Sequence, residues 1–186
     1  LQLALMTNNK DTKAISSDIS EMEEMIDGYL AFAAGEGDEA PQELAVDELL
    51  NRLVTQAQKS HKFDITLSPV KDEIPAFPMR RNAIQRAFSN IISNAIRYST
   101  KTIVAIRIRN DEVIITFDDN GAGIPQERRA DAIRPFIRLE ESRNRRTGGA
   151  GLGLSITSDV ILSHGGELTL GDSPLGGLRV AVKLPV

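Results

Sequence analysis

The sequence predicts an α+β fold, a two-layer sandwich in which a mixed sheet is covered by helices on one face. Three observations support this fold class. Short segments alternate between apolar and polar residues, as half-buried strands do; amphipathic segments with a period near 3.6 residues separate them; and their order mixes hairpins with single helices. The 186 residues, 41% of them apolar and 26% charged, suit one or two compact domains.

The N-terminal stretch predicts part of a helical hairpin. After a polar turn at Thr7–Asp11, the segment Thr12–Ala34 carries apolar residues at alternating spacings of four and three, which is typical of a helix packed in a bundle or coiled coil. An amphipathic helix lying on its own domain remains an alternative. Two glycines, a proline and three acids in Gly35–Pro41 predict a domain boundary. We therefore divide the chain into residues 1–36 and 42–186.

The second region is predicted to alternate strands and helices. Asp47 is expected to N-cap the first helix, and Asn110-Asp111 is typical of a tight hairpin turn. The expected strands are Leu44–Val46, Phe63–Ser68, Ile74–Phe77, Thr102–Arg109, Glu112–Asp118, Glu167–Leu170 and Leu178–Leu184. The first expected helix runs from its cap at Asp47 to about Ser60. Two further helices are expected at Met79–Tyr98 and Leu154–Ser163, with a brief helical piece at Gln126–Ile133.

The helix expected at Met79–Tyr98 carries two stripes. Its apolar stripe runs through Ile84, Phe88, Ile91 and Ala95, and a polar stripe of Asn90, Asn94 and Arg97 lies roughly 100° round from it. Such a flanking polar stripe is expected where a helix lines a cleft. Asparagine is a poor helix former, so two asparagines one turn apart need a reason. An ordinary solvated surface is the alternative.

Two glycine-rich stretches follow. Asp118 to Pro125 places alternate glycines after a strand, so the backbone can turn sharply beside a carboxylate that accepts hydrogen bonds. Thr147 to Leu154 leads directly into a helix and presents backbone N–H groups suited to phosphate. The second stretch is neither a P-loop nor a convincing dinucleotide fingerprint. Four arginines precede it: Arg138, Arg143, Arg145 and Arg146. Plain loops and a solvated charge run remain the alternatives.

Taken in order, these motifs resemble the ATP-binding catalytic domain of sensor histidine kinases, in the superfamily of gyrase B, Hsp90 and MutL. Phe88–Ser99 resembles the asparagine box, Asp119–Gly123 the first glycine box, Pro135–Arg138 the phenylalanine box and Gly149–Leu154 the second glycine box. Gly176-Gly177 resembles the last glycine box. The similarity covers about Gln42–Val186 and is greatest to osmosensing kinases of the EnvZ type. It implies a Bergerat-type ATP-binding fold.

The resemblance also implies roles for single residues. Asn94 would bind Mg²⁺, Asn90 would act near the γ-phosphate, and Arg97 would contact phosphate; these three are the expected catalytic residues. Asp119 would accept a hydrogen bond from the adenine amino group. The full set expected to bind ATP is Asn90, Asn94, Arg97, Tyr98, Asp119, Gly121, Gly123, Ile124, Phe136, Arg138, Thr147, Gly149, Gly151, Leu152, Gly153 and Leu154.

The resemblance implies an enzyme that transfers the ATP γ-phosphate to a histidine on the dimerisation helix, from which it passes to an aspartate of a response regulator. The family's acceptor histidine has no counterpart here, and we interpret His61 and His164 as structural. An ATP-binding or dimerisation module without transfer activity, and an ATPase or serine kinase of the same superfamily, are the alternatives. The full-length protein is expected to form a homodimer through the helical hairpin.

Composition excludes several other classes. The chain has no cysteine, so disulfides and thiolate metal sites are excluded, and its apolar runs are too short to cross a bilayer. A net charge of −4 without a basic stripe argues against nucleic acid as a partner. Because the sequence starts at Leu1 and not at Met, within an expected helix, we interpret it as a fragment. The resemblance to sensor histidine kinases implies that it is the cytoplasmic portion of a bacterial inner-membrane sensor protein.

Overall fold

A two-layer sandwich forms the body of the protein in the computed structural model, which describes residues 39–71, 73–137 and 151–186. One layer is a five-stranded mixed sheet in the order β2-β4-β5-β7-β6, where β2 runs parallel to β4 and the other neighbours are antiparallel. Its strands span Asp64–Leu67 (β2), Lys101–Arg109 (β4), Glu112–Asp119 (β5), Glu167–Asp172 (β6) and Leu178–Pro185 (β7). The predicted fold class is confirmed.

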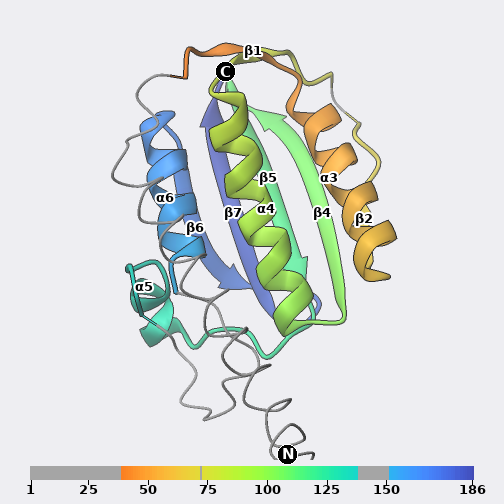
Figure 1. The fold of residues 1–186 in the computed structure, drawn as a ribbon, viewed down its shortest axis with the longest axis vertical. Coiled ribbons are helices and arrows are strands. Elements are labelled where there is room, and N and C mark those ends of the chain that lie inside the picture. The colour runs from red at the N-terminus through yellow and green to blue at the C-terminus, as the bar shows by residue number, and fades with distance from the viewer. Residues whose placement is uncertain (1–38, 72, 138–150) are drawn as a thin grey trace, which may run out of the picture.

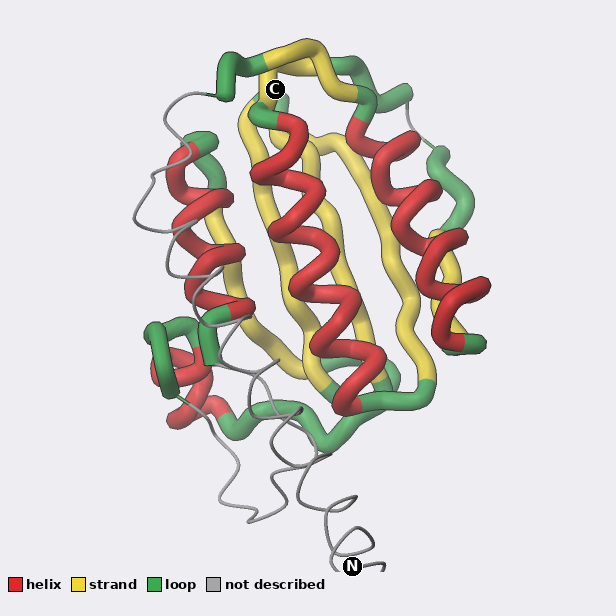
Figure 2. Tube along the Cα trace, viewed as in Figure 1, coloured by secondary structure: helices red, strands yellow, loops and turns green. Residues whose placement is uncertain are grey.

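Helices form the second layer on one face of this sheet (Figures 1 and 2). In the described part of the chain, the three long helices span Val46–His61 (α3), Arg81–Tyr98 (α4) and Gly153–Ser163 (α6). A short 3₁₀ helix at Gln126–Arg128 (η2) continues into α5 at Arg129–Ala132, as the brief helical piece predicted. At one end, β1 (Gln42–Leu44) and β3 (Phe77–Met79) form a separate two-stranded antiparallel sheet.

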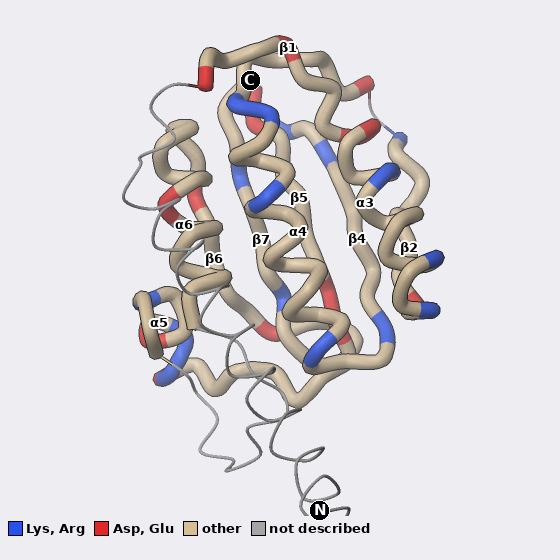
Figure 3. Tube along the Cα trace, in the orientation of Figure 1, with Lys and Arg blue, Asp and Glu red and all other residues tan. Residues whose placement is uncertain are grey.

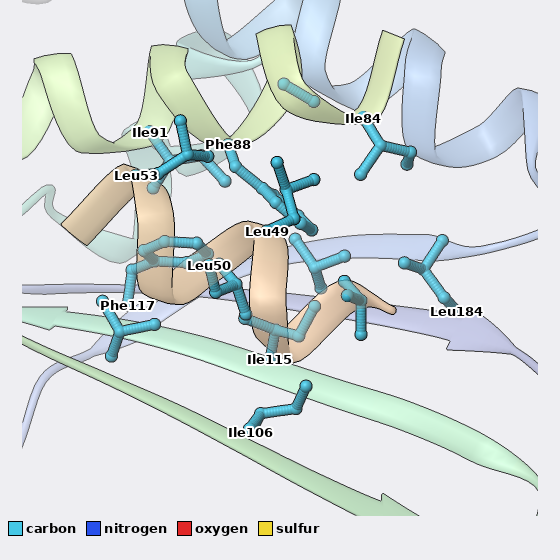
Figure 4. Close-up of a cluster of buried hydrophobic side chains, with 14 of the residues drawn as sticks. Leu49, Leu50, Leu53, Ile84, Phe88, Ile91, Ile106, Ile115, Phe117 and Leu184 are labelled. Carbon is cyan, nitrogen blue, oxygen red and sulfur yellow. The ribbon is translucent and has the colours of Figure 1, made fainter. Parts of the chain in front are cut away.

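The hydrophobic core lies between the two layers (Figure 4). The apolar stripe predicted for α4 is fully buried, and Phe88 meets Phe117 of β5 with ring centroids 5.9 Å apart. Strand residues alternate, so Val113, Ile115 and Phe117 face the helices. Because both layers contribute large side chains to this contact, α4 is held firmly across the middle of the sheet.

The hairpin between β4 and β5 has the predicted turn. Asn110 and Asp111 both have positive φ, of 53° and 60°, as a type I′ turn requires. The turn fixes the register, in which Thr102 opposes Asp119 at the other end of the two strands. The pairing of these two residues matters for the site below.

Two predicted boundaries near the N-terminal side of this domain are wrong. The first strand ends at Leu44, α3 begins at the fully buried Val46, and its N-cap is Ala45, so Asp47 lies in the first turn instead of capping it. A carboxylate in that turn still interacts favourably with the helix dipole.

The second wrong boundary concerns the strand before α4. This strand is Phe77–Met79 and not Ile74–Phe77, because Phe77 and Met79 are both buried while Pro78 between them is exposed. Helix α4 therefore starts two residues later than predicted. Its N-terminus is capped from outside the helix, since Glu39 accepts hydrogen bonds from the backbone N–H groups of Asn82 and Ala83 at 2.8 and 3.2 Å.

The predicted helical hairpin of residues 1–36 lies outside the described residues, so the two-domain division and dimerisation through that hairpin stay predictions. None of the described helices is long and apolar enough to cross a membrane.

Candidate functional site

A cavity of about 780 Å³ lies where the C-terminal half of α4, the end of β5 and the start of α6 meet. Most of the predicted site residues line it together, although they come from segments more than 60 residues apart in the sequence. They are Asn90, Asn94, Arg97, Tyr98, Asp119, Gly121, Gly123, Ile124, Gly151, Leu152, Gly153 and Leu154. The described structure therefore brings the motifs into one site.

The polar stripe of α4 forms one wall. Asn90 and Asn94 are half-buried, and Asn90 Nδ2 donates to the carbonyl oxygen of Gly153 at 3.3 Å. A Cβ on Gly153 would lie 3.8 Å from Asn94 Nδ2, so both amides face the first turn of α6. Arg97, one turn further on, is exposed at the cavity edge. The stripe is thus a cleft wall and not ordinary surface.

Asp119, at the end of β5, also lines the cavity. Its side chain is buried, and its Oδ1 accepts hydrogen bonds from the backbone N–H groups of Gly121 at 2.8 Å and Leu178 at 3.0 Å. Both hydrogen bonds that the described residues give this carboxylate go to Oδ1. The other oxygen, Oδ2, is therefore left for a ligand.

Close backbone contacts fix this carboxylate. A Cβ on Gly177 would lie 2.2 Å from Asp119 Oδ1, and a Cβ on Gly121 would lie 2.4 Å from the carbonyl oxygen of Tyr98. Such approaches are open only to glycine. The loop after β5 is thus pressed against α4 on one side and the turn before β7 on the other.

Asp118 precedes Asp119 but faces the other side of the sheet. It is also buried, and Arg179 of β7 binds it bidentately, with Nε to Oδ1 at 2.6 Å and Nη2 to Oδ2 at 2.8 Å. The side-chain hydrogen bond with Asp118 raises the pKa of Arg179 above its ordinary value. Both oxygens of Asp118 are occupied, so it has a structural role.

The start of α6 closes the cavity. Thr157 is fully buried, and its hydroxyl lies 2.8 Å from the carbonyl oxygen of Gly153 in its own helix and 3.3 Å from that of Ala87 in α4, so the second contact joins α6 to α4. Gly151, with a φ of 68°, accepts a hydrogen bond from the backbone N–H of Phe136 at 3.1 Å. The first N–H groups of α6 thus face the cavity, where they suit an anion.

Phe136 is the one predicted and described site residue that does not line the cavity. Its side chain is 63% exposed, and its neighbour Ile137 takes part in the lining instead. The predicted residues Arg138, Thr147 and Gly149 lie outside the described residues.

The charged side chains of the described lining are three arginines and one aspartate, namely Arg86, Arg97, Arg128 and Asp119. Figure 3 shows a basic position at the lower end of α4 and acidic positions nearby at the end of the sheet. The cavity lining carries more positive than negative charge, although the net charge of the chain is −4, and this favours an anionic ligand. Asp119 favours a ligand that also carries a hydrogen-bond donor.

Among the described residues, no three His, Asp or Glu side chains gather into a group that could hold a metal ion. A cation bound here together with an anion could take one protein ligand from a side-chain amide oxygen. Asn94 fits that need, because its amide borders the cavity and no other described residue is hydrogen-bonded to it. Oxygen ligands of this kind suit Mg²⁺.

Sequence reasoning missed the apolar walls of the cavity, one threonine and two arginines. The missed lining residues are Arg86, Ile91, Ala95, Thr102, Phe117, Ala122, Pro125, Arg128, Ala132, Ile137, Ile156, Leu178 and Val180. Strand alternation could have found several of them, because Thr102, Phe117 and Val180 occupy helix-facing positions of their strands.

The two histidines lie away from the cavity lining. His61 is the exposed last residue of α3. His164 joins α6 to the start of α4, since its Nε2 accepts from the backbone N–H of Arg80 at 3.1 Å and its Nδ1 lies 2.7 Å from the carbonyl oxygen of Val160. A structural role for His164 is consistent with these contacts.

Residues 79–186 match a family described as histidine kinase-, DNA gyrase B-, and HSP90-like ATPase. The chain is 33% identical over 185 residues to the sensor histidine kinase CpxA of Escherichia coli strain K12, covering 96% of this chain and 40% of the relative. It is 31% identical to the sensor protein RstB of the same strain, covering 95% of this chain and 42% of the relative. The chain thus spans less than half the length of these curated relatives.

Solved structures show the same fold. The ATP binding domain of PrrB from Mycobacterium tuberculosis superposes with a TM-score of 0.63 at 27% identity, covering 80% of this chain and 98% of that one. Full-length ShkA in complex with AMPPNP superposes with a TM-score of 0.67 at 19% identity, covering 78% of this chain and 31% of that one.

Proposed function

The chain belongs to the histidine kinase-, DNA gyrase B- and HSP90-like ATPase family, and we propose that it binds ATP with Mg²⁺ and transfers the γ-phosphate to a histidine of a sensor kinase. One observation carries this proposal: Asp119, the asparagine stripe of α4 and the first turn of α6 meet in a single cavity of about 780 Å³. That volume suits a nucleotide.

The adenine base occupies the end of the cavity lined by Asp119. The free Oδ2 of this carboxylate accepts a hydrogen bond from the exocyclic amino group of the base, while Ile91, Phe117 and Val180 provide apolar walls for its faces. Because Oδ1 is already held by two backbone N–H groups, the carboxylate does not need to reorient on binding. Pre-organisation of this kind raises affinity.

The phosphates occupy the other end. The N–H groups at the start of α6 and the guanidinium of Arg97 contact their oxygens, and Asn94 contributes an amide oxygen to a magnesium ion. The ion, when bound, neutralises charge that builds up on the phosphate oxygens during transfer. Asn90 lies one turn before Asn94 in α4, is hydrogen-bonded to the first residue of α6, and orients the γ-phosphate. In this arrangement Asp119 binds the base, and the polar residues of α4 act on the phosphates.

Neither histidine of the chain is the acceptor in this proposal. His164 joins α6 to the start of α4, and His61 is the last residue of α3; neither lines the cavity. The acceptor is a histidine on a dimerisation helix, and the phosphoryl group then passes to the receiver domain of a response regulator. Similarity to bacterial sensor proteins supports a homodimer and the cytoplasmic part of a membrane-anchored sensor.

The test is phosphotransfer to a supplied acceptor. The protein is incubated with γ-labelled ATP, Mg²⁺ and a purified histidine-bearing helical hairpin from a sensor kinase, and acid-labile phosphate on the acceptor is measured. We expect time-dependent labelling that Asn94→Ala reduces about 100-fold or more, because one Mg²⁺ ligand is lost. Ser93→Ala is the matched control, since Ser93 is exposed beside Asn94 and does not line the cavity.

The other outcomes identify the alternatives. Nucleotide binding without any label on the acceptor contradicts a kinase and favours a binding module. Steady release of phosphate without an acceptor favours an ATPase. An acid-stable label favours a serine kinase of the same superfamily.

A further inference from the structure

A buried threonine, Thr102 of β4, lies in the wall of the cavity beside Asp119. Its side chain is 1% exposed, it faces the helical layer, and it lines the cavity. In the β4–β5 register it directly opposes Asp119. Cross-strand neighbours of this kind have Cβ atoms about 4.5–5.5 Å apart, so both side chains can reach one edge of a flat ligand.

The hydroxyl of Thr102 is poorly satisfied by the described residues. Its hydrogen-bond contact is with Ser99 Oγ at 3.5 Å, which is long for two hydroxyl oxygens. Ser99 Oγ itself donates to the carbonyl oxygen of Ala95 at 2.8 Å, so any proton between the two hydroxyls comes from Thr102. A buried hydroxyl with only this long contact is costly, and a ligand that accepts its proton removes the cost.

We propose that Thr102 is a specificity-determining residue, whose hydroxyl donates a hydrogen bond to N1 of adenine while Asp119 Oδ2 accepts one from the amino group. This proposal deepens the function proposed above and rests on it. The two side chains together present a donor and an acceptor to the edge on which adenine carries an acceptor and a donor. Guanine carries the reverse pattern, an oxygen at position 6 and an N–H at position 1, so both contacts would be mismatched.

The test removes the donor from the protein and the acceptor from the ligand. Dissociation constants for ATP and 1-deaza-ATP, in which a C–H replaces N1, are measured by calorimetry for the wild-type chain and for Thr102→Val. We expect the wild type to bind ATP about three- to tenfold more tightly than 1-deaza-ATP, the range for one neutral hydrogen bond. Thr102→Val is expected to bind both nucleotides with about the affinity that the wild type has for 1-deaza-ATP.

Two further variants separate recognition from packing. Thr102→Ser keeps the hydroxyl and is expected to retain the preference for ATP. Thr116→Val makes the same change on β5 at a residue that does not line the cavity, and should bind both nucleotides as the wild type does. The inference is overturned if Thr102→Val still prefers ATP, or if the wild type binds the two nucleotides equally. A wild-type chain that binds neither nucleotide contradicts the proposed function as well.

Discussion

Asp118 and Asp119 are adjacent in sequence and similarly buried, yet the two sides of the sheet give them different hydrogen-bond partners. On the outer face, Arg179 occupies both oxygens of Asp118. On the helix-facing side, two backbone N–H groups donate to one oxygen of Asp119, a residue that lines the cavity, and the described residues give its other oxygen no hydrogen bond. Burial alone therefore does not identify the carboxylate that we propose binds the ligand. What distinguishes it is hydrogen-bonding capacity that the described residues leave unused.

The comparison predicts that substitutions on the helix-facing side change ligand affinity and substitutions elsewhere change stability. The largest combined effect is expected for Gly177→Ala. The new Cβ would overlap Asp119 Oδ1 at 2.2 Å and the backbone nitrogen of Gly121 at 2.4 Å. We expect a loss of about 1–3 kcal/mol in the free energy of unfolding, together with about tenfold weaker ATP binding. Denaturant titration and calorimetry measure the two effects.

Gly171→Ala is the control for that variant. A Cβ on Gly171 meets nothing closer than Arg179 Cβ at 4.0 Å, so both stability and affinity should stay near the wild-type values. If Gly177→Ala binds ATP normally, the position of the Asp119 carboxylate does not depend on the turn before β7.

A smaller effect, confined to stability, is expected for Asp118→Asn. The change removes the charge that balances Arg179, but Arg179 is 38% exposed and water compensates for part of the loss. We expect the free energy of unfolding to fall by about 1–2 kcal/mol, or a few degrees in Tm. The dissociation constant for ATP should change less than about twofold. A large loss of affinity would mean that the two faces are not independent.

The smallest effect is expected for Glu39→Gln, at the end of α4 away from the cavity. Glu39 accepts from two backbone N–H groups of the first turn, and a neutral amide interacts less favourably with the helix dipole. We expect a loss of about 0.3–1 kcal/mol in stability with unchanged ATP affinity. Chemical denaturation followed by circular dichroism measures it. Weaker ATP binding would show that this capping contact also positions the asparagines.

Much of this architecture could be predicted because local patterns agree with the tertiary structure. The two stripes of α4, the Asn110-Asp111 turn and the strands of the main sheet are correct to within two residues. The similarity to sensor histidine kinases is confirmed by the family match and by the relatives. That prediction rested on the order of the motifs, because each glycine-rich stretch alone could also be an ordinary loop.

The rest depended on contacts between distant segments. The strand Phe77–Met79 was missed because its spacing also suits the start of a helix, and only pairing with β1 decides between them. The capping of α4 by Glu39 crosses 43 residues. Strand alternation places Thr102 on the helix-facing side, but only the β4–β5 register places it opposite Asp119. The different partners of Asp118 and Asp119 likewise follow from strand pairing, because the local sequence does not distinguish the two carboxylates.

The central claim is that Asp119 accepts a hydrogen bond from the base of a nucleotide in this cavity and that Asp118 does not contact the nucleotide. Calorimetric titration of ATP into the wild type, Asp119→Asn and Asp118→Asn tests it directly. Asparagine keeps an acceptor for the two backbone N–H groups and places an N–H donor at the position of Oδ2, so we expect Asp119→Asn to bind about 30-fold more weakly with nearly unchanged Tm. Asp118→Asn should bind like the wild type. Equal affinities for Asp119→Asn and the wild type would contradict the account.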